Sequence, residues 1–347
     1  MNTIAESPTL ISKGVLLEDD AVRILDRRIF PFSTEYVICR NFEDVALAIE
    51  QMVTQSGGPF FAASAGFVIA ARAAEMFASP DDRLRYLEEA AARLVRTRPT
   101  NNNIRDVVGQ LMRLAQATLS ENRFSTVLES EMREMWERQW RNGRELGENA
   151  ATLINDGDTI LTHCWAESSI IDTLSAAVRS NKKVSVICTE TRPYLQGSRL
   201  TAHSIAEMGI DVTVITDNMA THAMDRGMVS KLMTAADRVT LSGHVINKVG
   251  THQLAIAAHN FSIPFVAMVR FPDAKAQTPS DVKMEERDGN ESLYCMGMRT
   301  ASPLAKGWYP AFDVTPPRFV SAVATSIGVF SPLMLHQKFA DYDPLNR

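Results

Sequence analysis

Cysteines are scarce in this chain of 347 residues, and none lies close to another in sequence. The four are Cys39, Cys164, Cys188 and Cys295. Because there is no C-x-x-C pair, a zinc site is not expected, and the wide spacing is typical of a protein whose thiols stay reduced. We therefore expect no metal ion and a cytoplasmic location.

Long apolar runs and long basic runs are also missing. A membrane helix needs about 20 consecutive apolar residues, so no membrane partner is expected. With a net charge of −5 and no long basic run, the chain is not expected to bind nucleic acid. A local anion site is still compatible with this charge. The first residues, MNTIAESPTL, lack the basic and apolar regions of a signal peptide. These absences favour a soluble globular protein.

The glycine-rich fingerprints of nucleotide-binding proteins, G-x-G-x-x-G and the P-loop, are absent as well. What the first part of the chain does contain is helical spacing of apolar residues, in residues 44–54, 67–77, 82–96 and 103–149, preceded by short strand-like stretches. Residues 1–145 are therefore predicted to form a mostly helical N-terminal domain with a small β-sheet.

From about residue 150 the pattern changes to short apolar runs that alternate with helical segments. The runs are 159–162, 184–189, 211–216, 231–236 and 264–269. This β-α-β-α order is typical of a parallel sheet covered on both faces. Right-handed crossovers make such a sheet doubly wound. Residues 146–347 are therefore predicted to form a Rossmann-like α/β domain, so the fold class of the whole chain is α/β.

Side chains with useful chemistry follow the ends of these runs. They are His163 and Cys164, then Glu190, Thr191 and Arg192, then Asp217 and Asn218, then Asp237 and Arg238, and finally Arg270. Ligands of open parallel sheets bind outside the carboxyl ends of the strands. Each residue alone has an ordinary explanation, such as helix capping or a buried thiol. Their concentration at one edge nevertheless predicts a site there.

Cys164 lies where a strand is expected to become a helix. Unpaired N–H groups and the helix dipole at such a position favour thiolate and lower the thiol pKa. A thiol of this kind can exchange protons near neutral pH or act as a nucleophile. His163 is not expected to pair with it, because adjacent strand residues point to opposite faces.

Two predicted helix starts have the composition of anion sites. The residues concerned are Gln196, Gly197, Ser198 and Arg199 in the first, and Asn247, Lys248 and Gly250 in the second. A helix N-terminus with a nearby cation suits a phosphate group, although a capped surface helix has the same composition. Arg98, in the segment RTRPTNNN, supplies another cation, and the alternative there is a polar loop.

Several longer segments resemble one enzyme family. The segments ETRPYLQGSRLTA, GIDVTVITDNMA, AADRVTLSGHVINKVGT, EERD and PAFDVTP are similar to those of the aldose-1-phosphate isomerase family. This family includes methylthioribose-1-phosphate isomerase and ribose-1,5-bisphosphate isomerase, and the alpha, beta and delta subunits of translation initiation factor 2B are related to it. The resemblance covers nearly the whole chain. It implies a helical N-terminal domain, a Rossmann-like C-terminal domain for catalysis and dimerisation, a homodimer and no cofactor.

The resemblance also implies the roles of individual residues. Cys164 in THCWA and Asp237 in AADRV match the catalytic cysteine and aspartate of the family. The expected contacts to phosphate and sugar are Arg98, Gln196, Asn247 and Lys248, with Gly58 in the loop that holds the substrate. The implied reaction converts an aldose 1-phosphate into a ketose 1-phosphate by moving hydrogen from C2 to C1. The sequence leaves open whether an enediol-like intermediate or a hydride shift carries it.

Two departures from the family pattern bear on the substrate. The segment QSGGPFFA (55–62) lacks the arginine of the family's Arg-Gly-Ala-Pro segment, and Trp165-Ala166-Glu167 stands where Asn-Ala-Gly is usual. We therefore expect a sugar phosphate other than methylthioribose 1-phosphate. The alternatives are a regulatory protein like the initiation-factor subunits, which generally lack the Cys164–Asp237 combination, and a sugar-phosphate-binding protein without turnover.

Overall fold

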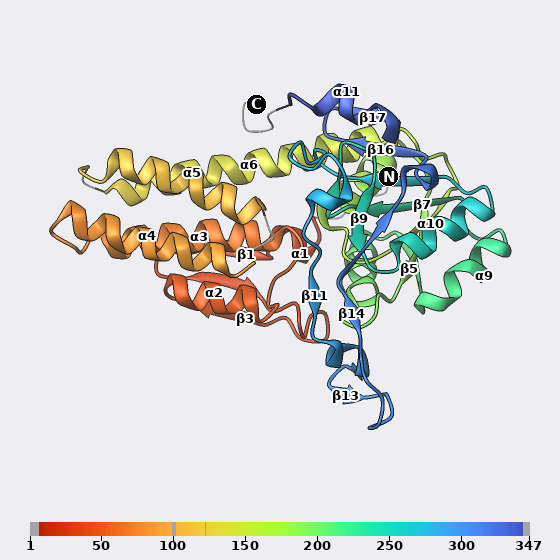
Figure 1. Ribbon diagram of the computed structural model, residues 1–347, viewed down its shortest axis with the longest axis horizontal. Coiled ribbons are helices and arrows are strands. Elements are labelled where there is room, and N and C mark those ends of the chain that lie inside the picture. Colours follow the sequence, from red (N-terminus) through yellow and green to blue (C-terminus); the bar gives the residue numbers. More distant parts are fainter. Residues whose placement is uncertain (1–6, 99–101, 122, 343–347) are drawn as a thin grey trace. The chain divides into compact units, whose positions relative to one another are not determined.

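The computed structural model describes residues 7–98, 102–121 and 123–342, and the chain divides into two compact units (Figure 1). The first unit is Thr9–Trp140, and the second holds the residues from Arg141 onward. The division falls inside the long helix α6 (Phe124–Ala151). The boundary proposed from the sequence, between residues 145 and 146, lies in the same helix.

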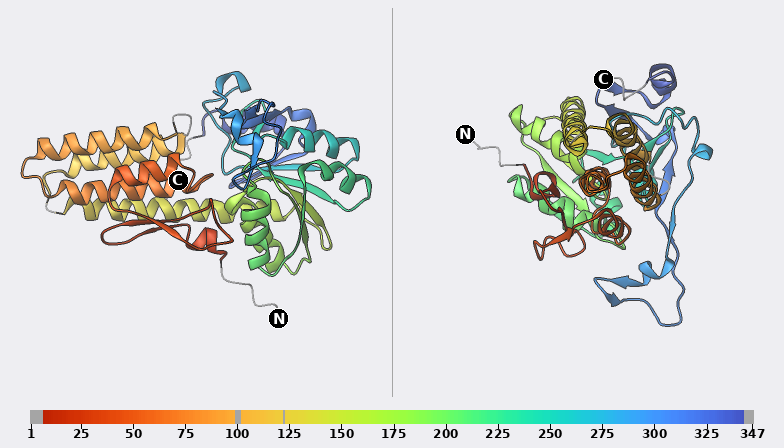
Figure 2. Two further views of the ribbon diagram at one scale, coloured as in Figure 1. Left: turned by 90° about the horizontal axis from the view of Figure 1, so that it is seen from below. Right: turned by 90° about the vertical axis from the view of Figure 1, so that its left-hand side faces the viewer.

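The first unit combines a small sheet with a helical bundle. The antiparallel strands β1 (Val15–Leu17), β2 (Val22–Leu25) and β3 (Tyr36–Cys39) are followed by α2 (Phe42–Glu50), α3 (Gly58–Ala74), α4 (Pro80–Arg96) and α5 (Asn102–Thr118), after the short α1 (Thr9–Ser12). Helix α3 is rich in alanine and glycine and is buried on nearly all sides. Small side chains let α2, α4 and α5 pack closely around it (Figure 2).

Local sequence signals set the starts of two of these helices. The Asn41 side chain accepts a hydrogen bond from the Asp44 N–H at 2.8 Å, and α2 begins there. Helix α4 begins after Ser79, whose hydroxyl accepts from the Asp81 N–H, with Pro80 in the first helical position. Both are common N-terminal signals, because they satisfy or remove N–H groups that lack helical partners.

The second unit is built on a seven-stranded sheet. Its order is β17-β16-β10-β7-β4-β5-β6. The strands are β4 (Thr159–Thr162), β5 (Ser185–Thr189), β6 (Asp211–Ile215), β7 (Lys231–Ala235), β10 (Phe265–Met268), β16 (Ala322–Thr325) and β17 (Gly328–Phe330). Neighbours are parallel except β17, which is antiparallel to β16. The predicted fold class is confirmed, and all five predicted runs end within one residue of the observed strands.

The strand order identifies where a ligand is expected. From β4 the chain proceeds outward through β5 and β6, and it then returns to the other side of β4 with β7, β10 and β16. The winding direction therefore reverses between β4 and β7, and such a switch point leaves a crevice at the carboxyl ends of the two strands. The helices between the strands are α7 (Glu167–Arg179), α8 (Ala202–Glu207), α9 (Ala220–Asp225) and α10 (Thr251–Asn260).

A second, smaller sheet corrects one expectation from the sequence. Asn247 and Lys248 were expected at a helix start, but they end strand β9 (Val245–Lys248). This strand pairs antiparallel with β8 (Arg238–Val239) and β15 (Phe312–Thr315). The helix begins only at Thr251, after Gly250, whose φ of +107° is left-handed and suits glycine.

The remaining elements form an extended arm and a C-terminal segment. In the arm, β11 (Glu286–Arg287) pairs with β14 (Tyr309–Pro310), and β12 (Tyr294–Cys295) pairs with β13 (Met298–Arg299) (Figure 1). The segment 320–335, proposed as either interface or core, contains the buried strand β16 and the exposed Leu333 before α11 (Leu335–Phe339). In the described part of the chain, no helix is long and apolar enough to cross a membrane.

Candidate active site at the carboxyl ends of β4 and β7

Cys164 follows β4 in a left-handed backbone conformation. Its φ is +66°, which is uncommon for a residue with a side chain. Its N–H donates to the Thr191 hydroxyl at 2.9 Å, and its carbonyl accepts from the Thr201 hydroxyl at 2.6 Å. Both ends of this residue are therefore held by segments that are distant in sequence.

Asp237 follows β7, the strand beside β4 in the sheet. Ile160 and Leu161 of β4 lie opposite Lys231 and Leu232 of β7, so the loops after both strands emerge at the same edge. The negative charge of Asp237 acts on the Cys164 thiol. The two residues thus flank the switch point of the sheet, and the Asp237 side chain is exposed to solvent there.

The environment of the thiol differs from the one expected from sequence. Burial raises the pKa of Cys164, and this exceeds the lowering by the Lys248 charge and by a hydrogen bond from the Trp165 N–H. Asp237 and Asp217 raise the pKa further. The expected lowering by the helix is wrong, because α7 begins only at Glu167 and the thiol lies before its first turn.

Both ring nitrogens of His163 form hydrogen bonds with groups other than Cys164, in line with its expected orientation on the strand. Its Nε2 lies 3.0 Å from the Val249 carbonyl oxygen, which can only accept, so Nε2 carries the proton. Burial lowers the pKa of the ring, and Nδ1 of the neutral ring accepts from the Thr189 hydroxyl at 2.6 Å. His163 therefore braces the loop after β9 rather than activating Cys164.

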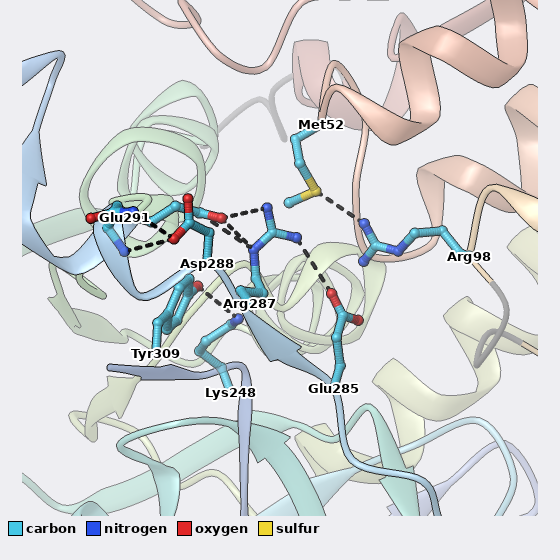
Figure 3. A network of polar contacts seen from close by, with 9 residues as sticks. Met52, Arg98, Lys248, Glu285, Arg287, Asp288, Glu291 and Tyr309 are labelled. Carbon is cyan, nitrogen blue, oxygen red and sulfur yellow. Dashed lines mark hydrogen bonds and ion pairs between the residues drawn. The ribbon is translucent and has the colours of Figure 1, made fainter. Parts of the chain in front are cut away.

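Lys248 is a buried cation in the same region. Its Nζ donates to the Tyr309 hydroxyl at 3.2 Å (Figure 3) and lies 5.3 Å from the Tyr309 ring centre and 5.1 Å from that of Phe312. Among the described residues, no carboxylate lies within ion-pairing distance of it. The Asp313 carboxylate interacts with this ammonium through its charge, but its oxygens accept from the N–H groups of Gly250 and His252. A buried ammonium that forms no direct ion pair favours an anionic ligand.

Asn247 and the start of α10 are satisfied within the protein. The Asn247 amide donates to the Thr251 hydroxyl at 3.0 Å. Asp313 of β15 accepts from the N–H groups of Gly250 at 2.7 Å and His252 at 3.1 Å. The chain's own carboxylate thus accepts from the N–H groups of this helix start, so an anion bound in this segment would depend on Lys248 and Asn247 rather than on those N–H groups. Lys248 remains the cation of this segment.

Gln196 precedes a rare π-helix, Gly197–Thr201, which continues into α8. Gln196 is buried, and Arg199 is also buried, with its Nη2 donating to the Tyr194 carbonyl at 2.7 Å and its guanidinium over the Tyr194 ring. This arginine therefore serves the local fold, which the sequence did not predict. π-helices are often found at functional sites.

Arg98 and Gly58 belong to the first unit. The Arg98 Nη1 donates to the Met52 sulfur at 3.0 Å (Figure 3). A Cβ at Gly58 would lie 2.0 Å from the Thr54 hydroxyl and 2.9 Å from Arg27 Nη2. Packing thus explains the glycine without a ligand. Arg27 also donates to the Gln55 carbonyl at 2.6 Å, so a buried guanidinium lies behind the loop that lacks an arginine of its own.

Glu167 introduces a charge at the first residue of α7. Its charge acts on Arg270, which follows β10, and Asp172 acts on the same guanidinium. Burial lowers the pKa of Arg270, and both carboxylates oppose this. Trp165, the other bulky departure from the family pattern, has a side chain that is only 3% exposed.

Sequence reasoning missed several residues of this region. Thr201 and Tyr309 were not singled out, and Thr191 was noted only as one of the residues after β5. Arg287, next to Tyr309 in Figure 3, contacts Glu285 and Glu291. The two threonines lie in the motif ETRPYLQGSRLTA, which was interpreted as an anion site. Across the described ranges, no group of three or more His, Cys, Asp or Glu side chains could hold a metal ion.

Comparison with known proteins extends these observations. The sequence model of the initiation factor 2 subunit family matches residues 60–332 of this chain. The methylthioribose-1-phosphate isomerase of Thermotoga neapolitana is 36% identical over 324 residues, which cover 90% of this chain and 93% of the relative. A putative methylthioribose-1-phosphate isomerase of Archaeoglobus fulgidus is 38% identical over 327 residues, covering 90% and 95%.

Two solved structures have similar folds. The crystal structure of 5-methylthioribose 1-phosphate isomerase from Pyrococcus horikoshii has a TM-score of 0.87 and 27% identity, covering 97% of this chain and 98% of that one. The translation initiation factor eIF-2B, subunit delta, from A. fulgidus has a TM-score of 0.81 and 33% identity, covering 92% and 96%.

Proposed function

Because this chain belongs to the initiation factor 2 subunit family, we propose that it is a sugar-phosphate isomerase that converts an aldose 1-phosphate into the corresponding ketose 1-phosphate. The observation that carries the proposal is the placement of Cys164 and Asp237 after β4 and β7, on either side of the switch point. The names of the similar isomerases support the same reaction class.

Lys248 is assigned to the phosphate group of the substrate. Its buried ammonium forms no direct ion pair in the described ranges, and its charge acts on the Asp313 carboxylate and on the Cys164 thiol. A phosphate bound there gains a charge-assisted hydrogen bond while remaining near the reacting carbons. Gln196 and Asn247 of the second unit are the further proposed contacts to phosphate and sugar. For Arg98 and Gly58, which belong to the first unit, contact with the substrate is what the family resemblance implies.

The two proposed catalytic groups differ in their environments. The raised pKa of Cys164 keeps its thiol protonated near neutral pH. Such a thiol could donate a proton or line the site beside C1 and C2 as an uncharged group. Asp237 is exposed and is assigned to the proton of the ring oxygen or of O2. In the net reaction the C1–ring oxygen bond breaks, the ring oxygen gains a proton, hydrogen moves from C2 to C1, and O2 loses its proton to become the ketone oxygen. An enediol-like intermediate and a hydride shift both satisfy this balance.

We expect the substrate to differ from methylthioribose 1-phosphate. The loop 55–59 has no arginine, and a lost charge-assisted hydrogen bond is worth about 1.5–3 kcal/mol. The test is kcat/KM for methylthioribose 1-phosphate beside ribose 1-phosphate and shorter sugar 1-phosphates. A value of about 10⁴ M⁻¹s⁻¹ or more for the thioether substrate, an ordinary enzyme rate, would contradict this expectation.

A non-catalytic function is the second candidate, because the initiation-factor subunit of A. fulgidus is also similar to this chain over most of its length. Under this alternative the protein binds a sugar phosphate without turnover. A thermal-shift screen distinguishes the two, since a ligand of the folded state raises Tm whether or not it reacts. Stabilisation by an aldose 1-phosphate that remains unconverted after prolonged incubation would favour the binding protein.

A further inference from the structure

Cys164 has a backbone conformation that its neighbours in sequence do not explain. A φ of +66° is disfavoured for residues other than glycine, and it persists only where surrounding structure imposes it. Here the two peptide groups on either side of Cys164 are each bound by a threonine hydroxyl, and both threonines are fully buried.

Thr201 holds the carbonyl side. Its hydroxyl donates to the Cys164 carbonyl at 2.6 Å. Thr201 is the last residue of the π-helix Gly197–Thr201. Gly197 lets this helix approach β5 closely, because a Cβ there would lie 1.8 Å from the Thr189 carbonyl oxygen. The position of the Thr201 hydroxyl is thus set by a tight contact with the sheet.

Thr191 holds the N–H side. Its hydroxyl accepts from the Cys164 N–H at 2.9 Å. Thr191 is itself left-handed, with φ +61°. Asp217 holds this turn, because its two carboxylate oxygens accept from the N–H groups of Thr191 at 2.8 Å and Arg192 at 2.7 Å.

We infer that Thr191 and Thr201 are positioning residues for Cys164, whose hydroxyls hold its backbone left-handed and thereby aim its thiol. The direction of the Cα–Cβ bond follows from the backbone conformation, so release of either peptide group turns the thiol away from the Trp165 N–H and from Lys248. The kinetic consequence of this inference rests on the proposed function, whereas its effect on thiol reactivity does not.

The test removes the hydroxyl of Thr201 or of Thr191 while keeping the shape of the side chain. Thr201→Val and Thr191→Val are compared with Thr201→Ser and Thr191→Ser, which retain the hydroxyl. Thr173→Val is the matched control, because the buried Thr173 hydroxyl donates to the Ser169 carbonyl at 2.6 Å within α7 and does not hold Cys164. Alkylation of Cys164 by iodoacetamide is followed across pH by peptide mass spectrometry, which separates it from Cys295.

We expect the dependence of Cys164 alkylation on pH to be shifted from that of the wild type in both valine variants. It should match the wild type in both serine variants and in Thr173→Val. With an aldose 1-phosphate that the wild type converts, kcat should fall by about 10²-fold, the order expected from a displacement of ~1 Å, with little change in KM. Unchanged profiles and kcat in the valine variants, with a Tm loss equal to that of Thr173→Val, would overturn the inference.

The two proposals fail in different ways. If the wild type converts no aldose 1-phosphate but the valine variants displace the alkylation profile, the isomerase assignment is wrong and the positioning of Cys164 stands. If the wild type is active and the valine variants match it in both measurements, the positioning inference is wrong and the isomerase assignment stands.

Discussion

At the scale of the residue, the Cys164 thiol is subject to opposing influences. Burial raises its pKa most strongly, while the Lys248 charge and the Trp165 N–H lower it. Asp237 stands on the neighbouring strand end with an exposed side chain. Two groups of different proton affinity beside one carbon skeleton can serve as acid and base for an isomerisation.

Removing either group should therefore affect the reaction rather than binding. We expect Cys164→Ser and Asp237→Asn each to lower kcat by about 10²–10⁴-fold and to change KM far less. Cys295→Ser, in strand β12 of the arm, is the control and should retain wild-type kcat. Steady-state kinetics on a converted aldose 1-phosphate checks this, and wild-type activity in both site variants would refute the roles.

Asp172 on α7 provides a second residue-scale prediction, which concerns stability. Burial raises its pKa to about 6 despite the nearby Arg270, Arg144 and Arg179. The folded state thus binds this proton more tightly than the unfolded chain does. The resulting stabilisation is complete below the unfolded pKa of about 3.9 and is lost as pH rises through about 6.

Asp172→Asn should therefore raise Tm relative to wild type at pH 8, and the difference should shrink as pH falls to about 4.5. The shift in pKa sets an upper limit of about 3 kcal/mol on the gain. Asp225→Asn, at an exposed site on α9, is the control and should show no such trend. Thermal unfolding across pH measures both, and a gain for Asp172→Asn that is larger at pH 4.5 than at pH 8 would contradict the argument.

At the scale of the element, the π-helix Gly197–Thr201 connects β5 to α8 and carries the Thr201 hydroxyl to Cys164. This path depends on close packing against the sheet at Gly197. The same motif was interpreted from sequence as an anion site, because glycine and serine are common at helix starts and an arginine near a helix start suits a phosphate. In the folded chain Gly197 instead allows the π-helix to approach β5, and Arg199 donates to the Tyr194 carbonyl.

Gly197→Ala should destabilise the protein by about 3 kcal/mol, the upper end of the range for overpacking, because the new methyl group would meet the backbone of β5. Gly109→Ala in α5 is the matched control: its Cβ would have its nearest neighbour at 3.7 Å. That change should stabilise slightly, since alanine favours helix over glycine. Denaturant unfolding gives both values, and equal stabilities of the two variants would rule out the close approach.

At the scale of the whole molecule, the chain belongs to a family whose similar members include isomerases and an initiation-factor subunit. Its fold is shared by both kinds of protein, so fold alone does not decide the activity. For the assembly state, we propose a two-fold homodimer through the second unit, as the family resemblance implies. In segment 320–335, Leu333 is 77% exposed, which makes it a suitable probe.

Sedimentation at micromolar concentration should show a dimer. Leu333→Glu should shift the equilibrium toward monomer. A two-fold contact buries the same residue in both subunits, so the substitution would place a negative charge in the interface twice. Leu304→Glu, at a residue that is 93% exposed on the arm, is the matched control and should leave the dimer intact. A monomeric wild type would count against the proposal, and a dimer unaffected by Leu333→Glu would place the contact elsewhere.

The sequence by itself determined the elements and the edge of the sheet where the site lies. Apolar alternation is a local property, so β4 to β7 and β10 could be predicted within one residue, and Cys164 and Asp237 follow from the ends of β4 and β7. Only the tertiary structure decided how these residues are held. The Cys164 pKa depends on burial by the whole fold, and Thr201, which binds its carbonyl, lies 37 residues further along the chain. Likewise, Asp313 reaches the start of α10 only because β15 pairs with β9. Contacts between distant segments have no periodic signature, and for this physical reason they could not be predicted from the sequence.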